Sequence, residues 1–96
     1  MTAVANHASL GRQALRRSVN EQIRRTIDWD GSGSIDLFCE CGRVRCSDRL
    51  QIAIDEFDGV LGTSGWYIVL PGHEDGGAEH TVSRRDDVIV VARNGR

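Results

Sequence analysis

The spacing of apolar residues changes along the chain from a helical period to a strand period. Between residues 9 and 27, apolar side chains recur every four positions, which is the spacing of one stripe along a helix. The stripe consists of Leu15, Val19, Ile23 and Ile27. A capping-box pattern at residues 18–21 would allow a later start, but the good helix formers before it favour a first helix that begins at Ser9. Residues 1–8 lack the period, and we predict that they form a flexible N-terminus.

Alternation of apolar and polar residues in later runs predicts β-strands. The runs are residues 35–41, 50–54, 66–70 and 88–92. The last run is apolar on both faces, so we expect that strand to be central in its sheet or covered by a helix. Between the second and third runs, residues 55–61 predict a short helix whose inward face carries Phe57, Val60 and Leu61.

The predicted order of elements is α-β-β-α-β-β, and the short connections favour antiparallel pairing of neighbouring strands. We therefore predict the α+β fold class: a single small two-layer domain with a mainly antiparallel sheet, formed by residues 9–96. The composition agrees, because 96 residues with 40% hydrophobic and 27% charged residues are typical of one small soluble globular domain.

Charge and cysteine usage narrow the class of protein. A net charge of −2 provides no overall basic excess for nucleic-acid binding. No apolar run reaches the roughly 20 residues of a membrane-spanning helix, and the first ten residues lack the pattern of a signal peptide. The three cysteines are an odd number and lie close together, unlike the even and dispersed set of a secreted disulfide scaffold. We therefore expect a cytoplasmic protein without membrane association, in which clustered thiols have a metal or redox role.

The cysteines are spaced so that they can share one metal ion. Cys39 and Cys41 lie two residues apart on a predicted strand, so both sulfurs point to one face. The turn at Gly42 then allows Cys46 to fold back toward them. Tetrahedral zinc takes four nitrogen or sulfur ligands, so three thiolates need one partner from elsewhere. The simpler alternative is a cluster of idle thiols, and the spacing favours the metal.

The fourth ligand is expected to be a histidine. His73 is the best candidate, because it follows a Pro-Gly turn at the end of a strand that we expect to lie nearby. His80 is the second candidate, and His7 is a weak third because its segment is predicted to be mobile. A complete Cys3His shell has no open position, so the predicted site is structural rather than catalytic.

Three motifs follow one another along the chain. Residues 17–23 read R-x-V-N-E-x-I, residues 39–46 read C-E-C-x4-C and residues 71–74 read P-G-H-E. Together with the apolar run near the C-terminus, they resemble a family of small bacterial proteins, mostly actinobacterial, that has no assigned activity. The resemblance covers about residues 15–92. It implies that the Cys and His positions of the family correspond to Cys39, Cys41, Cys46 and His73.

Other features have simpler explanations. Residues 28–36 match most positions of an EF-hand loop, but Cys39 stands where the bidentate Glu should be. We therefore interpret this segment as a polar turn and expect no calcium binding. The acidic loop around Glu74, Asp75 and Glu79 is interpreted as solvated rather than as an acid–base site. The first helix carries an arginine-rich flank, which we interpret as a solvated face rather than as a phosphate-binding surface. The arginines are Arg12, Arg16, Arg17, Arg24 and Arg25.

The sequence thus predicts a small zinc-binding domain without enzymatic activity. Its expected role is regulatory or as an adaptor that acts through contacts with an unidentified protein partner. One alternative is a nucleic-acid-binding regulator that uses the arginine-rich helix. The other is a zinc–thiolate redox sensor, in which oxidation of the cysteines releases the metal.

Overall fold

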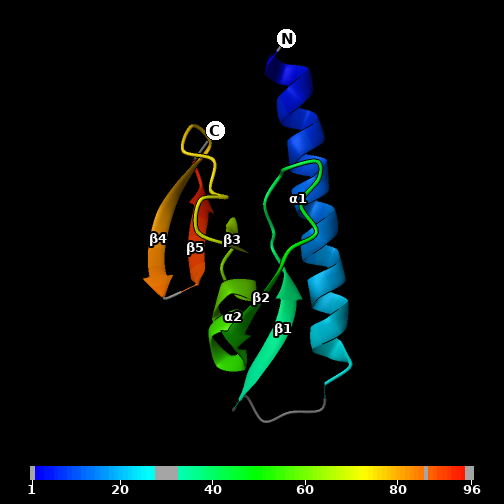
Figure 1. The fold of residues 1–96 in the computed structure, drawn as a ribbon, viewed down its shortest axis with the longest axis vertical. Coiled ribbons are helices and arrows are strands. Elements are labelled where there is room, and N and C mark those ends of the chain that lie inside the picture. Colours follow the sequence, from blue (N-terminus) through cyan, green and yellow to red (C-terminus); the bar gives the residue numbers. More distant parts are fainter. Residues whose placement is uncertain (1, 28–32, 86, 95–96) are drawn as a thin grey trace.

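Two helices and two antiparallel sheets make up the part of the chain that the computed structural model describes, which is residues 2–27, 33–85 and 87–94 (Figure 1). In chain order the elements are α1 (Thr2–Arg25), β1 (Ser34–Phe38), β2 (Arg49–Ala53), α2 (Ile54–Leu61), β3 (Trp66–Val69), β4 (Glu79–Arg85) and β5 (Val88–Arg93). The first sheet pairs β1 with β2, and the second has the order β3-β5-β4. The predicted α+β class and antiparallel pairing are confirmed, although the strands form two sheets rather than one.

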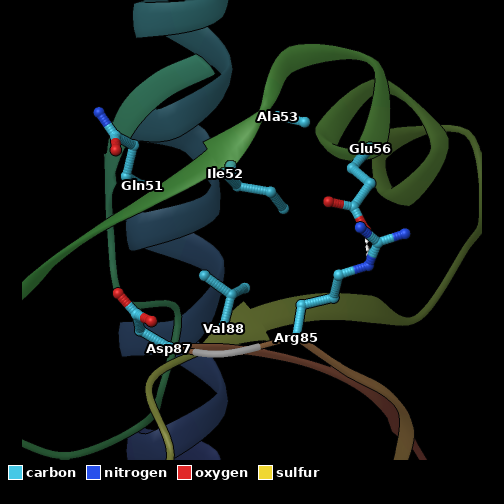
Figure 2. Close-up of a pocket in the computed structure, with 7 residues that line it drawn as sticks. All are labelled: Gln51, Ile52, Ala53, Glu56, Arg85, Asp87 and Val88. Atoms are coloured by element: carbon cyan, nitrogen blue, oxygen red, sulfur yellow. Dashed lines mark ion pairs between the residues drawn. The ribbon is translucent and has the colours of Figure 1, made fainter. Parts of the chain in front are cut away.

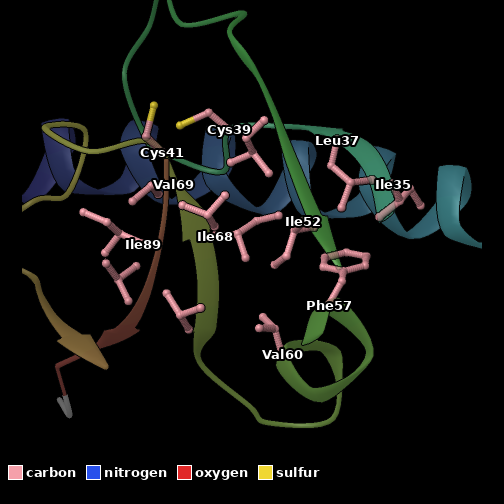
Figure 3. Close-up of a cluster of buried hydrophobic side chains, with 14 of the residues drawn as sticks. Ile35, Leu37, Cys39, Cys41, Ile52, Phe57, Val60, Ile68, Val69 and Ile89 are labelled. Atoms are coloured by element: carbon pink, nitrogen blue, oxygen red, sulfur yellow. The ribbon is translucent and has the colours of Figure 1, made fainter. Parts of the chain in front are cut away.

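The core is built from the apolar residues that the alternation along each strand places on one face. On β1 and β2 every second residue is buried, and on α2 the buried residues are Ile54, Phe57 and Val60. Residues 88–91 of β5 are all buried, because β5 is the central strand of its sheet, as predicted. Figure 3 shows this cluster, with the sulfurs of Cys39 and Cys41 at one end of it. The predicted metal ligands therefore adjoin the core.

Strand β4 is absent from the sequence prediction. All of its residues after Glu79 are exposed, so no apolar alternation marks it. Among the described strands it pairs with β5 alone, at the edge of its sheet, and the pairing shifts register between Thr81 and Ser83. Backbone hydrogen bonds to a neighbour are sufficient to form such a strand, and hydrophobic periodicity does not report them.

Helix α1 differs from the prediction in both its start and its orientation. It begins at Thr2 rather than Ser9, and the capping-box pattern lies in its interior. Leu15 is 65% exposed and Val19 39% exposed, so half of the predicted apolar stripe faces solvent. Only the stripe residues near the C-terminal end, Ile23 and Ile27, pack against the core. Among the α1 side chains that the structure describes, from Leu10 onward, the fully buried ones are polar, Gln13 and Asn20. No helix among the described residues has the length and apolar character needed to cross a bilayer.

An ion pair connects α1 to α2 and makes stability depend on pH. Two nitrogens of Arg24, Nε and Nη2, donate to the carboxylate oxygens of Asp58 at 2.8 and 3.0 Å. The hydrogen bond from Arg24 lowers the pKa of Asp58 below its usual value. The charged form therefore stabilises the folded state above the unfolded pKa, and this stabilisation is lost as the pH falls through the folded pKa.

We expect Asp58→Asn to lower the melting temperature slightly at neutral pH, because an exposed ion pair contributes little. The difference from wild type should shrink as the pH falls below the unfolded pKa of about 4, and it should vanish below the lowered folded pKa, where Asp58 is protonated in both states. Thermal unfolding of both proteins over a pH series measures this difference. A difference in melting temperature that stays the same at every pH would contradict a stabilising ion pair between Arg24 and Asp58.

Candidate metal centre

Two of the predicted ligands lie directly after β1. The strand ends before Cys39 and Cys41, so the predicted strand over residues 35–41 is too long. Hydrogen bonds nevertheless hold the backbone in place: the Cys39 N–H donates to Asp48 O at 2.9 Å, and the Glu40 N–H donates to a β3 carbonyl at 2.7 Å. Both cysteine side chains are 1% exposed. The two thiols are thus held on one side of an extended segment, as the C-x-C spacing predicted.

Two turns bring the other predicted ligands to the same place. In the first, the Cys46 N–H donates to Arg43 O at 3.4 Å, and the chain reverses before β2. In the second, the His73 N–H donates to Leu70 O at 2.9 Å across the Pro-Gly turn. Gly72 has a φ of 87°, a value that favours glycine and that a turn of this kind needs after proline. The P-G-H sequence therefore aims the imidazole back toward the cysteines.

The four side chains converge on one point. His73 Nδ1 lies 3.5 Å from Cys39 Sγ, 3.6 Å from Cys41 Sγ and 3.5 Å from Cys46 Sγ. All four ligand atoms lie within 4.8 Å of one another. A tetrahedral zinc ion with Zn–S bonds of about 2.3 Å and Zn–N bonds of about 2.0–2.1 Å requires S···N separations of about 3.5–3.6 Å. The donor set therefore fits a single tetrahedral ion.

The protein environment opposes ionisation of the buried thiols unless a cation is present. Burial raises the pKa of Cys39, and the nearby Cys41 and Cys46 raise it further. The Leu70 N–H donates to Cys39 Sγ at 3.3 Å and acts in the opposite direction. Burial also raises the pKa of Cys41. A divalent cation between the sulfurs would favour the thiolates, so metal binding at this group would release protons.

Two charged side chains lie around the four predicted ligands. The Asp48 carboxylate is 3.8 Å from His73 Nε2, the ring nitrogen that faces away from the sulfurs. A metal bound at Nδ1 would leave the ring proton on Nε2, on the side of this carboxylate. Arg16 Nη1 donates to Cys41 O at 2.6 Å and lies 3.8 Å from Cys41 Sγ. Three thiolates with a divalent ion carry one net negative charge, which the Arg16 guanidinium partly offsets.

A buried charged group anchors the segment between the first two cysteines. Glu40 is 0% exposed and accepts hydrogen bonds from Arg17 Nε (2.8 Å), Arg17 Nη2 (3.0 Å), Asn20 Nδ2 (2.9 Å) and the Ile68 N–H (3.0 Å). The Asn20 amide also exchanges two hydrogen bonds of 2.9 Å with the backbone of Phe38. The R-x-V-N-E and C-E-C motifs are therefore parts of one cluster, a relation that the spacing of these residues along the chain does not reveal.

The interpretation of the α1 arginines as a solvated face is wrong for most of them. Arg12 Nε donates to Gly42 O at 2.7 Å, Arg16 and Arg17 contact the C-E-C segment, and Arg24 pairs with α2. Only Arg25 fits the prediction, since it is exposed and its pair with Glu21 is a long one, at 3.9 Å. The arginine pattern marks a polar attachment of α1 to the rest of the protein.

The structure separates the remaining candidates from the metal centre. His80 is exposed, and its Nδ1 lies 2.8 Å from Asn94 Oδ1. The side chain of His7 and most of the proposed calcium loop, residues 28–32, lie outside what the structure describes. Glu79 is not solvated as predicted: it is buried and accepts from Gln13 Nε2 at 2.7 Å.

A pocket of about 270 Å³ lies away from the four predicted ligands, between the first sheet with α2 and the β4–β5 hairpin (Figure 2). Glu56 and Arg85 face each other across it, and their side chains pair at 3.1 Å. Because the two side chains neutralise each other, they offer a ligand less charge than the Cys-His group offers a metal ion.

No protein-family model matches this chain, and neither the curated proteins nor the solved structures include a match. The resemblance to the actinobacterial family therefore stays a prediction.

Proposed function

We propose that this protein is a small cytoplasmic zinc-binding domain in which Cys39, Cys41, Cys46 and His73 hold a structural zinc ion. The observation that carries the proposal is the convergence of three Sγ atoms on His73 Nδ1 at 3.5–3.6 Å. Zinc is favoured over other divalent ions because three soft thiolates and one imidazole in a tetrahedral arrangement are its usual ligands.

The same arrangement supports a structural rather than an enzymatic role. Four protein ligands complete the tetrahedron and leave no position for a water molecule or a substrate. Cys39 and Cys41 are almost fully buried at the end of the core, so an ion here would connect β1, the turn before β2 and the turn after β3. We therefore propose a regulatory or adaptor protein that acts through contacts with a protein partner.

Of the two alternatives, the structure favours the redox sensor over the nucleic-acid binder. The arginines of α1 that would contact phosphates are mostly engaged with the protein itself. Cys46, in contrast, is only partly buried, so an oxidant can reach one of the three thiolates. Peroxide treatment that releases zinc, with recovery after reduction, would support the sensor.

We expect the purified protein to contain one zinc ion per chain, because the four ligands complete one shell. Removal of the ion by a chelator should lower the melting temperature, since the folded protein binds the metal more tightly than the unfolded chain does. Elemental analysis and thermal unfolding measure these two quantities. A metal-free protein that has the same melting temperature and takes up no zinc would exclude the site.

A further inference from the structure

The middle of α1 is attached to the molecule mainly through the segment that carries the first two predicted ligands. The inward side chains of the helix donate to that segment, and most of the acceptors are backbone carbonyl groups. The contacts include Arg12 Nε to Gly42 O (2.7 Å), Gln13 Nε2 to Glu40 O (2.9 Å), Arg16 Nη1 to Cys41 O (2.6 Å), Arg17 Nε to Glu40 Oε2 (2.8 Å) and Asn20 Nδ2 to Phe38 O (2.9 Å). Two of the same side chains also reach the second sheet, Arg17 at Trp66 O and Gln13 at Glu79 Oε2.

Apolar packing contributes little to this attachment. The large apolar residues of the described part of the helix before Ile23, which are Leu10, Leu15 and Val19, are all exposed. Ile23 packs against the core, but it lies near the C-terminal end, where Arg24 also pairs with α2. The stability of the attached helix middle therefore depends on the position of a few carbonyl oxygens and of the Glu40 carboxylate.

Apart from Phe38 O, these carbonyl oxygens lie in the stretch that contains the three predicted cysteine ligands. The carbonyls of Glu40, Cys41 and Gly42 belong to the stretch from Cys39 to Cys46, and that stretch follows the end of β1. An ion bound by three of its side chains would hold this backbone in one conformation. Without the ion, the thiols have no common partner, and the acceptors for α1 lose that constraint.

We propose that the middle of α1 is docked through the metal: it packs on the ligand segment while the ion is bound and is released when the ion leaves. This inference rests on the proposed zinc site. Release would free the guanidinium groups of Arg12, Arg16 and Arg17 from their contacts within the protein. An undocked helix of this length is only marginally stable in water, so its amide protons lose protection.

Hydrogen exchange of the zinc-loaded and the chelator-treated protein tests the release. We expect amides of residues 12–22 to exchange at least about tenfold faster without zinc, and those of the central strand β5, which report the global stability, to accelerate by a clearly smaller factor. Equal protection of α1 in both samples would overturn the proposal. A uniform loss of protection in α1 and β5 would overturn it as well, since the metal would then hold the whole fold and not the helix in particular.

The coupling between zinc binding and helix docking must also act in the opposite direction, because a helix that docks on the metal-bound form stabilises that form. Arg12→Ala removes one contact with the ligand segment and should weaken zinc affinity about fivefold or more in a competition with a chelator. Arg24→Ala is the matched control: it removes an arginine contact of the same helix, but to Asp58 on α2, and should leave zinc affinity unchanged. Equal effects of the two changes would contradict the coupling.

Zinc content separates failure of this proposal from failure of the site. A protein that takes up no zinc refutes the site and the docking together. A protein that binds one zinc ion per chain, but whose α1 protection does not respond to the metal, refutes only the docking.

Discussion

Cys39→Ser should abolish stoichiometric zinc binding and lower the melting temperature more than any histidine substitution does. Cys39 is almost fully buried beside the core, and its Sγ accepts a hydrogen bond from the Leu70 N–H. A serine hydroxyl is a poor zinc ligand, and in this buried place neither water nor another side chain can substitute for the thiolate. Elemental analysis combined with thermal unfolding measures both effects.

The two histidine changes complete this test. His73→Ala should weaken zinc binding by less than Cys39→Ser does. His73 lies in a turn at the surface, where water or a carboxylate such as Asp48 can take the fourth position. His80→Ala should change neither zinc content nor stability, since that side chain is exposed and contacts Asn94. If His80→Ala were the more damaging of the two, the fourth ligand would be wrongly assigned.

Glu40→Ala is expected to destabilise the protein by about 3–5 kcal/mol, the usual cost of removing one partner from a buried charge pair. The carboxylate is 0% exposed and accepts from Arg17, Asn20 and the Ile68 N–H. Arg17 Nε and the Ile68 N–H would then lose this acceptor in a place that water does not readily reach, whereas Arg17 Nη2 keeps Trp66 O and Asn20 Nδ2 keeps Phe38 O. Urea unfolding of the zinc-loaded proteins measures the difference in free energy of unfolding.

Glu21→Ala provides the matched control for this prediction. Glu21 lies on α1, the helix that carries the Glu40 partners Arg17 and Asn20, and its carboxylate is 3.9 Å from Arg25 in an exposed pair. Its removal should change the free energy of unfolding by about 0.5 kcal/mol or less. If both glutamate changes had the same small effect, the Glu40 cluster would not anchor the ligand segment.

The local sequence patterns predict most of the core, because buried positions recur with the period of each helix or strand and are occupied by apolar residues. Strands β1, β2, β3 and β5 and the helix α2 each bury apolar residues, so each was predicted near its observed place. Strand β4 buries only Glu79, and its partner β5 supplies the hydrogen bonds that define it. A pattern that reports side-chain burial does not detect a strand that is held through its backbone.

The predicted ligands also fall into two groups, the cysteines, which are close in sequence, and the histidine, whose place depends on the fold. Cys39, Cys41 and Cys46 are close in sequence, so a strand followed by a turn is enough to bring their sulfurs together. His73 is 27 residues beyond Cys46, and the choice between it and His80 depends on how β3 lies beside the C-E-C segment. The backbone bond from Glu40 to Ile68 sets that arrangement, and it is a contact between distant parts of the chain.

The sequence by itself determined the apolar elements and the cysteine group, because both follow from short-range spacing. The orientation of α1 was decided only by the tertiary structure. The surface that receives this helix consists largely of backbone carbonyls and one buried carboxylate, so the helix turns arginines, Gln13 and Asn20 inward and leaves Leu15 and Val19 in solvent. Helical periodicity identifies the faces of a helix, but the chemistry of the partner surface determines which face is buried.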